Sequence, residues 1–256
     1  MSARDISRRE AHIALLIDAD NSPAAKIDVI LTELSTFGVT NVRRAYGNWK
    51  KNELKGWEEK LHEHAIRPMQ QFDYSKGKNA SDMAMVIDAL ELLYTDRPDA
   101  FGIVSSDADF TPLVMHLRAK GAAVYGFGAK KTPEPFVNAC SRFLYLDQLG
   151  NEATTEAGEA VPAVPLRMTT AQLKQDTRLV SLLRNAVQAA QDESGWARAD
   201  AVGQQIGNQA SFDSRNHGYA TLTKLLVATQ LFEFAHEGTS HVSVRDKRQT
   251  KATRSG

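Results

Sequence analysis

Cysteine is nearly absent from this 256-residue sequence, as are long apolar runs and a surplus of charge of either sign. The single Cys140 excludes a disulfide framework within the chain, which is typical of a reducing compartment, and its neighbours Val137 and Ala139 favour a buried thiol. No apolar run approaches the ~20 residues that cross a bilayer, and the first ten residues lack the apolar core of a secretory signal. We therefore expect a cytoplasmic protein that does not associate with membranes.

The charges balance, with 31 Lys and Arg against 31 Asp and Glu, but they are unevenly distributed. Acids prevail over the first 160 residues and bases over the remainder. Most of the positive excess lies in the last twelve residues, RDKRQTKATRSG, which hold five bases and one acid. Such a tail is typical either of a phosphate contact or of a solvated, disordered end, and both remain open.

Strand and helix patterns alternate through the first 146 residues, which predicts a parallel α/β sheet sandwiched by helices. The helix expected over residues 80–94 carries apolar residues at helical spacing, and we expect them to form its buried stripe. These residues are Met83, Val86, Ile87 and Leu90.

The sequence changes character after residue 149. The stretch GNEATTEAGEAVPAVP has no period of either kind and predicts a linker. Helical patterns near 177–191, 200–206 and 219–229 then precede two short strand-like runs around a turn at Gly238. Three helices followed by a hairpin indicate a small winged-helix domain, a fold used mostly to bind nucleic acid or protein.

Acidic side chains stand at the ends of predicted strands and at the start of one predicted helix. In a parallel sheet neighbouring strand ends lie ~5 Å apart, so carboxylates from different elements can share one ion. Oxygen ligands of this kind suit Mg²⁺ or Mn²⁺, and such an ion can support phosphodiester hydrolysis. The acids and a neighbouring amide are Asp18, Asp20, Asn21, Asp82, Asp107 and Asp109.

Each acid also has a structural explanation when it is considered alone. Asp18 or Asp20 can cap the helix expected after Ser22. Asp109 can cap the helix that follows it, and Asp82 suits the dipole of its own helix. Capping does not explain why four acids arrive independently at element ends, so the metal site is the favoured interpretation.

Two further roles depend on position. Asp107 lies nearer the strand end and is the stronger candidate for a direct ligand, whereas Asp109 is a ligand, a supporting acid or a cap. Lys78 lies one turn before Asp82, where it either pairs with that acid or holds a phosphate. His62 and His64 have no partner at metal-ligand spacing and are predicted to be surface residues.

Three blocks follow one another within residues 10–148: IALLIDADN, KGKNASDMAMVIDAL and FGIVSSDADFTPLVMHLRAKGAAVYGFG. In this order they resemble the NYN domain (LabA-like), a PIN-like group of nucleases with a Rossmannoid sheet. The resemblance implies a ribonuclease that depends on Mg²⁺ or Mn²⁺. The catalytic and metal-binding residues that it implies are Asp18, Asp82, Asp107 and Asp109. The supporting or substrate-contacting residues are Asn21, Asp20, Lys78, Ser105 and Ser106.

The C-terminal blocks GWARADAVGQQI, FDSRNHGYATLTKLLVATQLFEF and HVSVR resemble the LOTUS (OST-HTH) domain, which implies RNA binding and, in some members, protein binding. The candidate RNA contacts are Arg198, Arg215, His217, Tyr219 and Lys224. The predicted organisation is an NYN domain over 10–148, a flexible linker over 149–168, a LOTUS winged-helix domain over 169–246 and a basic disordered tail over 247–256.

The leading hypothesis is a metal-dependent ribonuclease to which the LOTUS-like domain recruits RNA. The alternative is a catalytically inactive protein that binds RNA or regulates. The spacing of Asp18 and Asp20 also matches the first motif of haloacid-dehalogenase-like phosphatases, although the lysine and late acidic motifs of that family are not evident. A protein partner of the C-terminal domain and self-association of the chain stay open.

Overall fold

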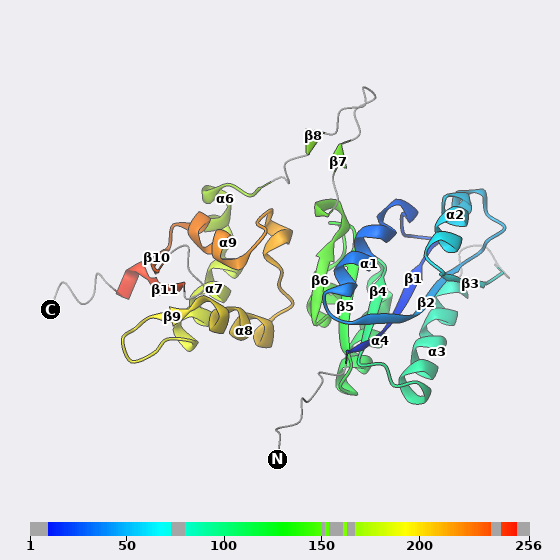
Figure 1. The fold of residues 1–256 in the computed structure, drawn as a ribbon, viewed down its shortest axis with the longest axis horizontal. Helices are drawn as coiled ribbons and strands as arrows, with labels where there is room; N and C mark the ends of the chain where they lie inside the picture. The colour runs from blue at the N-terminus through cyan, green and yellow to red at the C-terminus, as the bar shows by residue number, and fades with distance from the viewer. Residues whose placement is uncertain are drawn as a thin grey trace, which may run out of the picture. The chain divides into compact units, whose positions relative to one another are not determined.

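The computed structural model describes residues 10–72, 80–149, 152–153, 161–162, 167–236 and 242–249. The chain divides into two compact units, Met1–Leu146 and Asp147–Gly256 (Figure 1). Each unit has a hydrophobic core of its own.

The first unit contains one sheet of six strands in the order β3-β2-β1-β4-β5-β6, and every neighbouring pair is parallel. β1 and β4 are buried along almost their whole length, as expected for central strands covered on both faces. The strands are β1 (His12–Asp18), β2 (Val39–Gly47), β3 (Arg67–Gln70), β4 (Ala100–Val104), β5 (Ala123–Gly128) and β6 (Arg142–Tyr145). The predicted parallel α/β sandwich is confirmed.

Helices connect these strands, and right-handed crossovers place them on both faces of the sheet. The first two lie on one face, and the next three lie on the other because the strand order reverses after β3. The helices are α1 (Ile27–Ser35), α2 (Lys55–Glu63), α3 (Ala80–Thr95), α4 (Thr111–Ala119) and α5 (Glu134–Ala139). Short 3-10 turns are η1 (Ala24–Lys26), η2 (Asn52–Leu54), η3 (Ala108–Phe110) and η4 (Leu146–Gln148).

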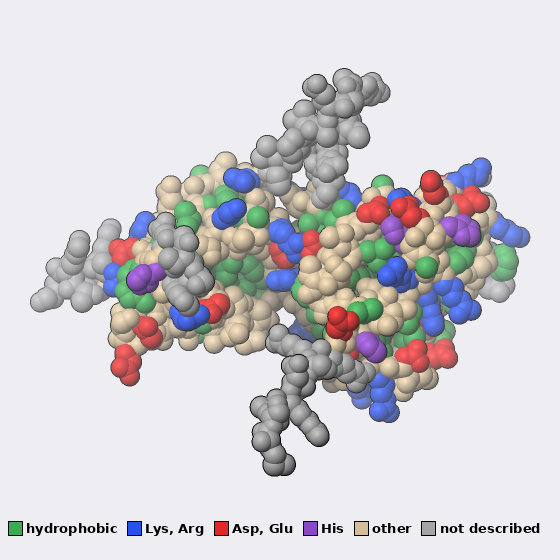
Figure 2. All heavy atoms as spheres, in the orientation of Figure 1, with side chains coloured by type: hydrophobic (Ala, Val, Ile, Leu, Met, Phe, Trp, Pro, Cys, Tyr) green, Lys and Arg blue, Asp and Glu red, His purple; other side chains and the backbone are tan. Residues whose placement is uncertain are grey.

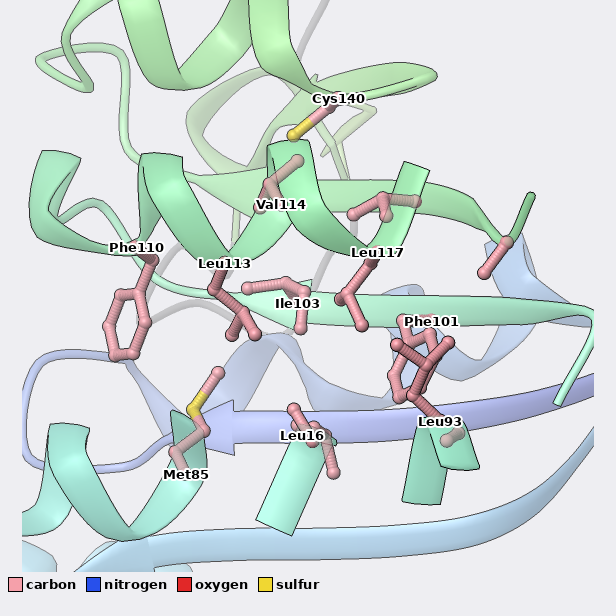
Figure 3. Close-up of a cluster of buried hydrophobic side chains, with 14 of the residues drawn as sticks. Leu16, Met85, Leu93, Phe101, Ile103, Phe110, Leu113, Val114, Leu117 and Cys140 are labelled. Atoms are coloured by element: carbon pink, nitrogen blue, oxygen red, sulfur yellow. The ribbon is translucent and has the colours of Figure 1, made fainter. Parts of the chain in front are cut away.

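The core of this unit packs α3 and α4 against the central strands. Leu16 of β1 and Ile103 of β4 meet Met85 of α3 and Leu117 of α4 (Figure 3). Cys140 belongs to the same cluster, and burial raises the pKa of its thiol to about 12. The expectation of a buried cysteine is therefore confirmed.

The stripe predicted to bury α3 is partly wrong. Met83 and Ile87 are 59% and 61% exposed, while Val86 and Leu90 are only partly buried against the core. Met85, which the prediction left out, is fully buried. The helix is apolar on two faces, so helical spacing alone does not identify the one that meets the sheet.

A buried polar contact fixes the rotation of α3. Asp88 is 8% exposed and accepts hydrogen bonds from the guanidinium of Arg44 and the hydroxyl of Tyr46, both on β2. Burial raises the pKa of Tyr46, and its hydrogen bond to Asp88 adds to this shift. A buried carboxylate needs such partners, so α3 must turn Asp88 toward β2.

Within the described residues of the second unit, four helices of six or more residues pack with a three-stranded antiparallel sheet in the order β10-β11-β9. The helices are α6 (Thr170–Gln175), α7 (Thr177–Ala189), α8 (Ala199–Gln209) and α9 (Leu222–Thr229), with a 3-10 turn η5 (Ser214–His217). The strands are β9 (Ala197–Arg198), β10 (Phe232–Ala235) and β11 (Ser243–Asp246). Sequence reasoning missed α6 and β9, both of which are short. The predicted turn at Gly238 lies outside the described residues.

Two short strands pair within the stretch predicted to be a linker. β7 (Glu152–Ala153) and β8 (Val161–Pro162) run antiparallel, with Ala153 opposite Val161. Among the described residues, no helix is both long enough and apolar enough to cross a membrane.

Candidate metal site at the strand ends

The carboxyl ends of β1 and β4 form the point where the strand order reverses. These two strands are neighbours, yet β1 connects onward to β2 on one side and β4 to β5 on the other. Open α/β sheets bind ligands at such a point, because the connecting segments separate there. Asp18 is the last residue of β1, and Asp107 follows the end of β4 by three residues.

Asp18 is almost fully buried, at 1% exposure. The amide nitrogen of Asn21 donates to both carboxylate oxygens over 3.3 and 3.1 Å, and the Ser105 hydroxyl donates to Oδ2 over 3.0 Å. Burial raises the pKa of Asp18, while these hydrogen bonds oppose the shift. The structure thus holds the carboxylate in place with neutral donors.

Ser105 links Asp18 to the second acidic segment. Its hydroxyl oxygen accepts from the backbone N–H of Asp107 over 3.1 Å, and Asp107 Oδ1 accepts from the backbone N–H of Asp109 over 2.8 Å. Gly128 lets β5 approach this loop, since an added Cβ would lie 2.6 Å from the Ser105 carbonyl oxygen. The capping role suggested for Asp109 belongs to Asp107, whose second oxygen is not needed for the cap.

Asp20 anchors the start of α3 beside this edge. Its Oδ2 accepts from the Ser81 hydroxyl over 2.7 Å, and its Oδ1 lies 3.3 Å from the ammonium nitrogen of Lys51. Ser81 immediately precedes Asp82, so the contact brings the first turn of α3 to the end of β1. Together with the buried Asp88, it determines where Asp82 lies.

The pKa of Asp82 depends on all the other acids of this edge. Partial burial, followed by repulsion from the neighbouring carboxylates, raises its pKa to about 6. The carboxylates that cause the repulsion are Asp18, Asp107, Asp20 and Asp109, in decreasing order. The structure therefore brings together acids from three separate segments of the chain, and their repulsion contributes to the raised pKa of Asp82.

The capping explanations for the first segment do not match the structure. η1 is preceded by Pro23 and α1 by Lys26, and neither helix start has a side-chain cap. Ser22, which precedes η1, donates to the carbonyl of Val104 at the end of β4 over 3.4 Å. Asp18 and Asp20 thus face the strand ends rather than the helix start.

The strand-end acids form an open cluster. Among the described residues, only Asp28, Glu63 and His64 place three ligand atoms within 4.8 Å of one another. Lys60 lies 3.2 Å from Asp28 and 2.7 Å from Glu63, so that group already contains a cation. The prediction that His64 is a surface residue is wrong, since its side chain is only 15% exposed and its Nε2 lies 3.0 Å from Asp28. The looser strand-end cluster fits Mg²⁺ or Mn²⁺, since these ions use one or two carboxylates and keep several waters. Its hard oxygen donors and mutual repulsion favour such a cation.

Ser106 and Lys78 were also predicted to belong to this site. Ser106 lies beside the acids, but its hydroxyl accepts from the backbone N–H of Ala129 over 2.8 Å and so braces the loop after β5. Lys78 lies outside the described residues. Sequence reasoning missed the contacts of Ser81 and Lys51 with Asp20, because they join segments that are distant in sequence.

Most of the residues proposed to contact RNA form contacts within the second unit. The guanidiniums of Arg198 and Arg215 pair with Asp200 and Asp213 over 2.7 and 2.9 Å. The Tyr219 hydroxyl donates to the Met168 carbonyl over 2.7 Å, and burial lowers the pKa of His217. Lys224 is exposed. On the face drawn in Figure 2, the described Lys and Arg side chains occur in small groups among Asp and Glu side chains.

Comparison with known proteins agrees with the two-unit structure. The NYN domain model matches residues 12–147, and the OST-HTH/LOTUS domain model matches residues 173–244. NYN domains are generally nucleases, and OST-HTH/LOTUS domains bind RNA.

Two individual proteins are also similar to this chain. An uncharacterized protein of Methanocaldococcus jannaschii is 31% identical over 125 residues, which are 47% of this chain and 49% of that protein. This chain therefore spans about half the length of that relative. A crystallised protein of unknown function from Vibrio parahaemolyticus has 19% identity and a TM-score of 0.44, over 54% of this chain and 94% of that one. That likeness is too weak to bear on function. The domain matches identify the chain as a member of the NYN domain family that carries an OST-HTH/LOTUS domain after its NYN domain.

Proposed function

We propose that this protein is a metal-dependent ribonuclease that hydrolyses RNA phosphodiester bonds at the strand-end acids. In this proposal Mg²⁺ or Mn²⁺ is held by carboxylates of the strand-end cluster, and the OST-HTH/LOTUS domain recruits RNA. The proposed catalytic and metal-binding residues are Asp18, Asp82, Asp107 and Asp109.

The observation that carries the proposal is the mutual repulsion of these acids. Asp82 has its pKa raised to about 6 by burial and by four other carboxylates. Within the described part of the chain, Asp20 is the one of these five acids that an ion pair joins to a base, Lys51. Concentrated negative charge is costly for folding, and a bound cation removes that cost. Strongly shifted groups at a ligand-binding edge of a sheet are typical of functional sites.

The residues of the chain prepare this site before substrate arrives. Asn21 and Ser105 orient the Asp18 carboxylate, and Ser105 also fixes the loop that presents Asp107. A divalent ion bound here supplies the charge that activates a water molecule and stabilises the oxygens of an in-line displacement. The ion-holding acids must be deprotonated, and the raised pKa values of Asp18 and Asp82 make this the step most sensitive to pH.

Cleavage by the Asp107→Asn variant tests the proposal. Asparagine keeps an oxygen that can accept from the Asp109 N–H, so the turn at η3 is preserved while the charge is lost. Losing one carboxylate of the ion site removes several kcal/mol of catalysis, so we expect at least a roughly 100-fold slower cleavage of single-stranded or structured RNA. Rates would be measured with Mg²⁺, with Mn²⁺ and with chelator.

Asp96→Asn is a matched control, because Asp96 is exposed just beyond the opposite end of α3. It removes the same charge from the same domain and should leave the cleavage rate unchanged. Equal cleavage by wild type and Asp107→Asn would refute the assignment of the site.

A catalytically inactive RNA-binding or regulatory protein is the second candidate, since the OST-HTH/LOTUS match supports RNA binding without turnover. This alternative predicts RNA affinity that chelator does not change and no cleavage with either metal. A protein partner and self-association remain predictions.

A further inference from the structure

A polar pocket of about 390 Å³ lies on the second unit, between α7 and the segment that ends β11. Two arginines, one aspartate and four amide side chains line it. Its volume is within the range of ligand sites, but such sites are usually lined by apolar and aromatic groups. None of the described residues that line this pocket has an apolar side chain, so the pocket does not suit the hydrophobic anchor of a peptide.

The pocket holds more positive than negative charge. Asp246 is 6% exposed and lies 3.1 Å from the guanidinium of Arg184 and 3.0 Å from that of Arg248. One carboxylate is thus shared by two guanidiniums, which leaves one positive charge. The Arg248 side chain is 64% exposed and remains accessible to an anion. By contrast, Arg198 and Arg215 of the same domain each have a carboxylate partner of their own.

Amide side chains supply both donors and acceptors beside these arginines. Asn185 and Gln188 project from the exposed face of α7, and within the described residues their side chains have no hydrogen-bond partner. Gln191 and Gln249 hydrogen-bond to each other over 2.6 and 3.2 Å and join α7 to the chain after β11. Asparagine and glutamine are the side chains that pair bidentately with adenine and bind other base edges.

The pocket lies where the positive excess of the sequence begins. The last twelve residues hold five bases, and their single acid is Asp246, which is buried and shared by two arginines. The charge presented to solvent by the described part of this segment is therefore positive. Basic residues around a polar pocket fit a phosphate-bearing ligand.

We propose that this pocket binds one nucleotide of a single-stranded RNA. Its phosphate lies at Arg248 and Arg184, and its base edge or ribose contacts the amides of Asn185 and Gln188. Among the described residues no aromatic side chain lines the pocket, so binding depends on charge and hydrogen bonds rather than stacking. The inference rests on the proposed recruitment of RNA by this domain, and it places the contact apart from the residues expected from the sequence.

The test is RNA binding by the full chain in the presence of chelator, which prevents cleavage. Fluorescence anisotropy with a labelled single-stranded RNA of mixed sequence would be measured over a salt series. Arg248→Gln should raise Kd roughly five- to tenfold and lower the slope of log Kd against log salt by about one, as expected for a lost phosphate contact. Gln188→Ala should raise Kd about threefold and leave the slope unchanged, because it removes a neutral contact.

Lys174→Gln is the matched control, since Lys174 is an exposed base of α6 in the same domain, outside the pocket and not among the candidate RNA contacts. It should leave Kd within about twofold and the slope unchanged. Thermal unfolding would verify that Arg248→Gln stays folded, as expected because Arg184 remains beside Asp246.

The outcomes separate this inference from the proposed function. If wild type binds RNA but Arg248→Gln binds with the same Kd and salt slope, the pocket assignment is overturned and recruitment by the domain stands. A loss of affinity in Lys174→Gln alone has the same meaning. If the full chain binds no RNA, both the pocket and the recruitment fail, whereas cleavage in the Asp107→Asn experiment is judged separately.

Discussion

Strand-end acids of the first unit are compensated differently from three acids of the second unit. In the second unit Asp200, Asp213 and Asp246 each contact an arginine two residues away in sequence. In the first unit Asp18 and Asp107 are held by hydroxyl, amide and backbone N–H donors, all of them neutral. The arginine pairs of the second unit balance charge within the fold. The neutral donors of the first unit orient the carboxylates and leave their charge unbalanced.

This difference separates structural acids from candidate ligand-binding acids. An acid paired with an arginine is stabilised in its charged form, and the Arg198 hydrogen bond lowers the pKa of Asp200 to about 2. An acid surrounded by other acids is destabilised, and the pKa of Asp82 rises to about 6. A fold that keeps the clustered strand-end carboxylates of the first unit gains from them only when a cation binds.

Replacing Asp82 by asparagine should have the largest effect and should change activity and stability in opposite directions. Cleavage should fall at least about 100-fold, because one ion-holding carboxylate is lost. In chelator the variant should unfold at a higher temperature, since the repulsion disappears; allowing for solvent screening, the gain is about 1 kcal/mol. Activity assays and thermal unfolding of the same preparation check both signs. A less stable variant would contradict the repulsion.

The pH dependence of cleavage should be the next largest effect. The pKa of Asp82 is about 6, so below pH 6 a proton competes with the ion, and the rate at limiting Mn²⁺ should fall roughly tenfold per pH unit. Raising Mn²⁺ should move the midpoint to lower pH. If the midpoint of the pH–rate curve lies near pH 4 and does not change with Mn²⁺ concentration, Asp82 is not involved.

Stability of the ion-free protein should change with the opposite sign. Between the ordinary pKa of 3.8 and the folded value of about 6, the folded state binds more protons than the unfolded state. Unfolding free energy therefore falls as pH rises through this window and levels off above it. Thermal unfolding in chelator between pH 4 and pH 7 measures this, and Asp82→Asn should flatten the curve.

The cluster of strand-end acids could be predicted because it follows from local sequence position and from the topology of the sheet. Each acid directly follows a strand or begins a helix, and a parallel sheet aligns the carboxyl ends of its strands. The buried face of α3 was not predictable, since Met83 and Met85 are both apolar and lie on different faces. The choice depends on Asp88 meeting Arg44 and Tyr46, which are more than forty residues away.

The charge pairs of the second unit could partly be predicted from the sequence. Arg198 and Arg215 each stand two residues from the aspartate that pairs with them, a spacing that the RNA-binding expectation overlooked. The pocket beside Asp246 could not be predicted, because it is formed by α7 and by the chain after β11, which lie some sixty residues apart in sequence. Charge excess at the C-terminus was the one signal for it.

Asp213→Asn should produce the smallest effect and tests the compensated side of the comparison. Asparagine can still accept from the backbone N–H of Arg215, but the charged contact between Asp213 and the Arg215 guanidinium, at 3.0 and 2.9 Å, is lost. Asp213 is 5% exposed and the Arg215 side chain 29%, so the loss should destabilise the second unit by roughly 1–2 kcal/mol. Hydrogen exchange of amides in that unit measures it, and cleavage of a short RNA should change less than twofold. Unchanged exchange combined with tighter RNA binding would instead mean that Asp213 restrains an RNA-contacting Arg215, and that a paired base in this domain is held ready for a ligand.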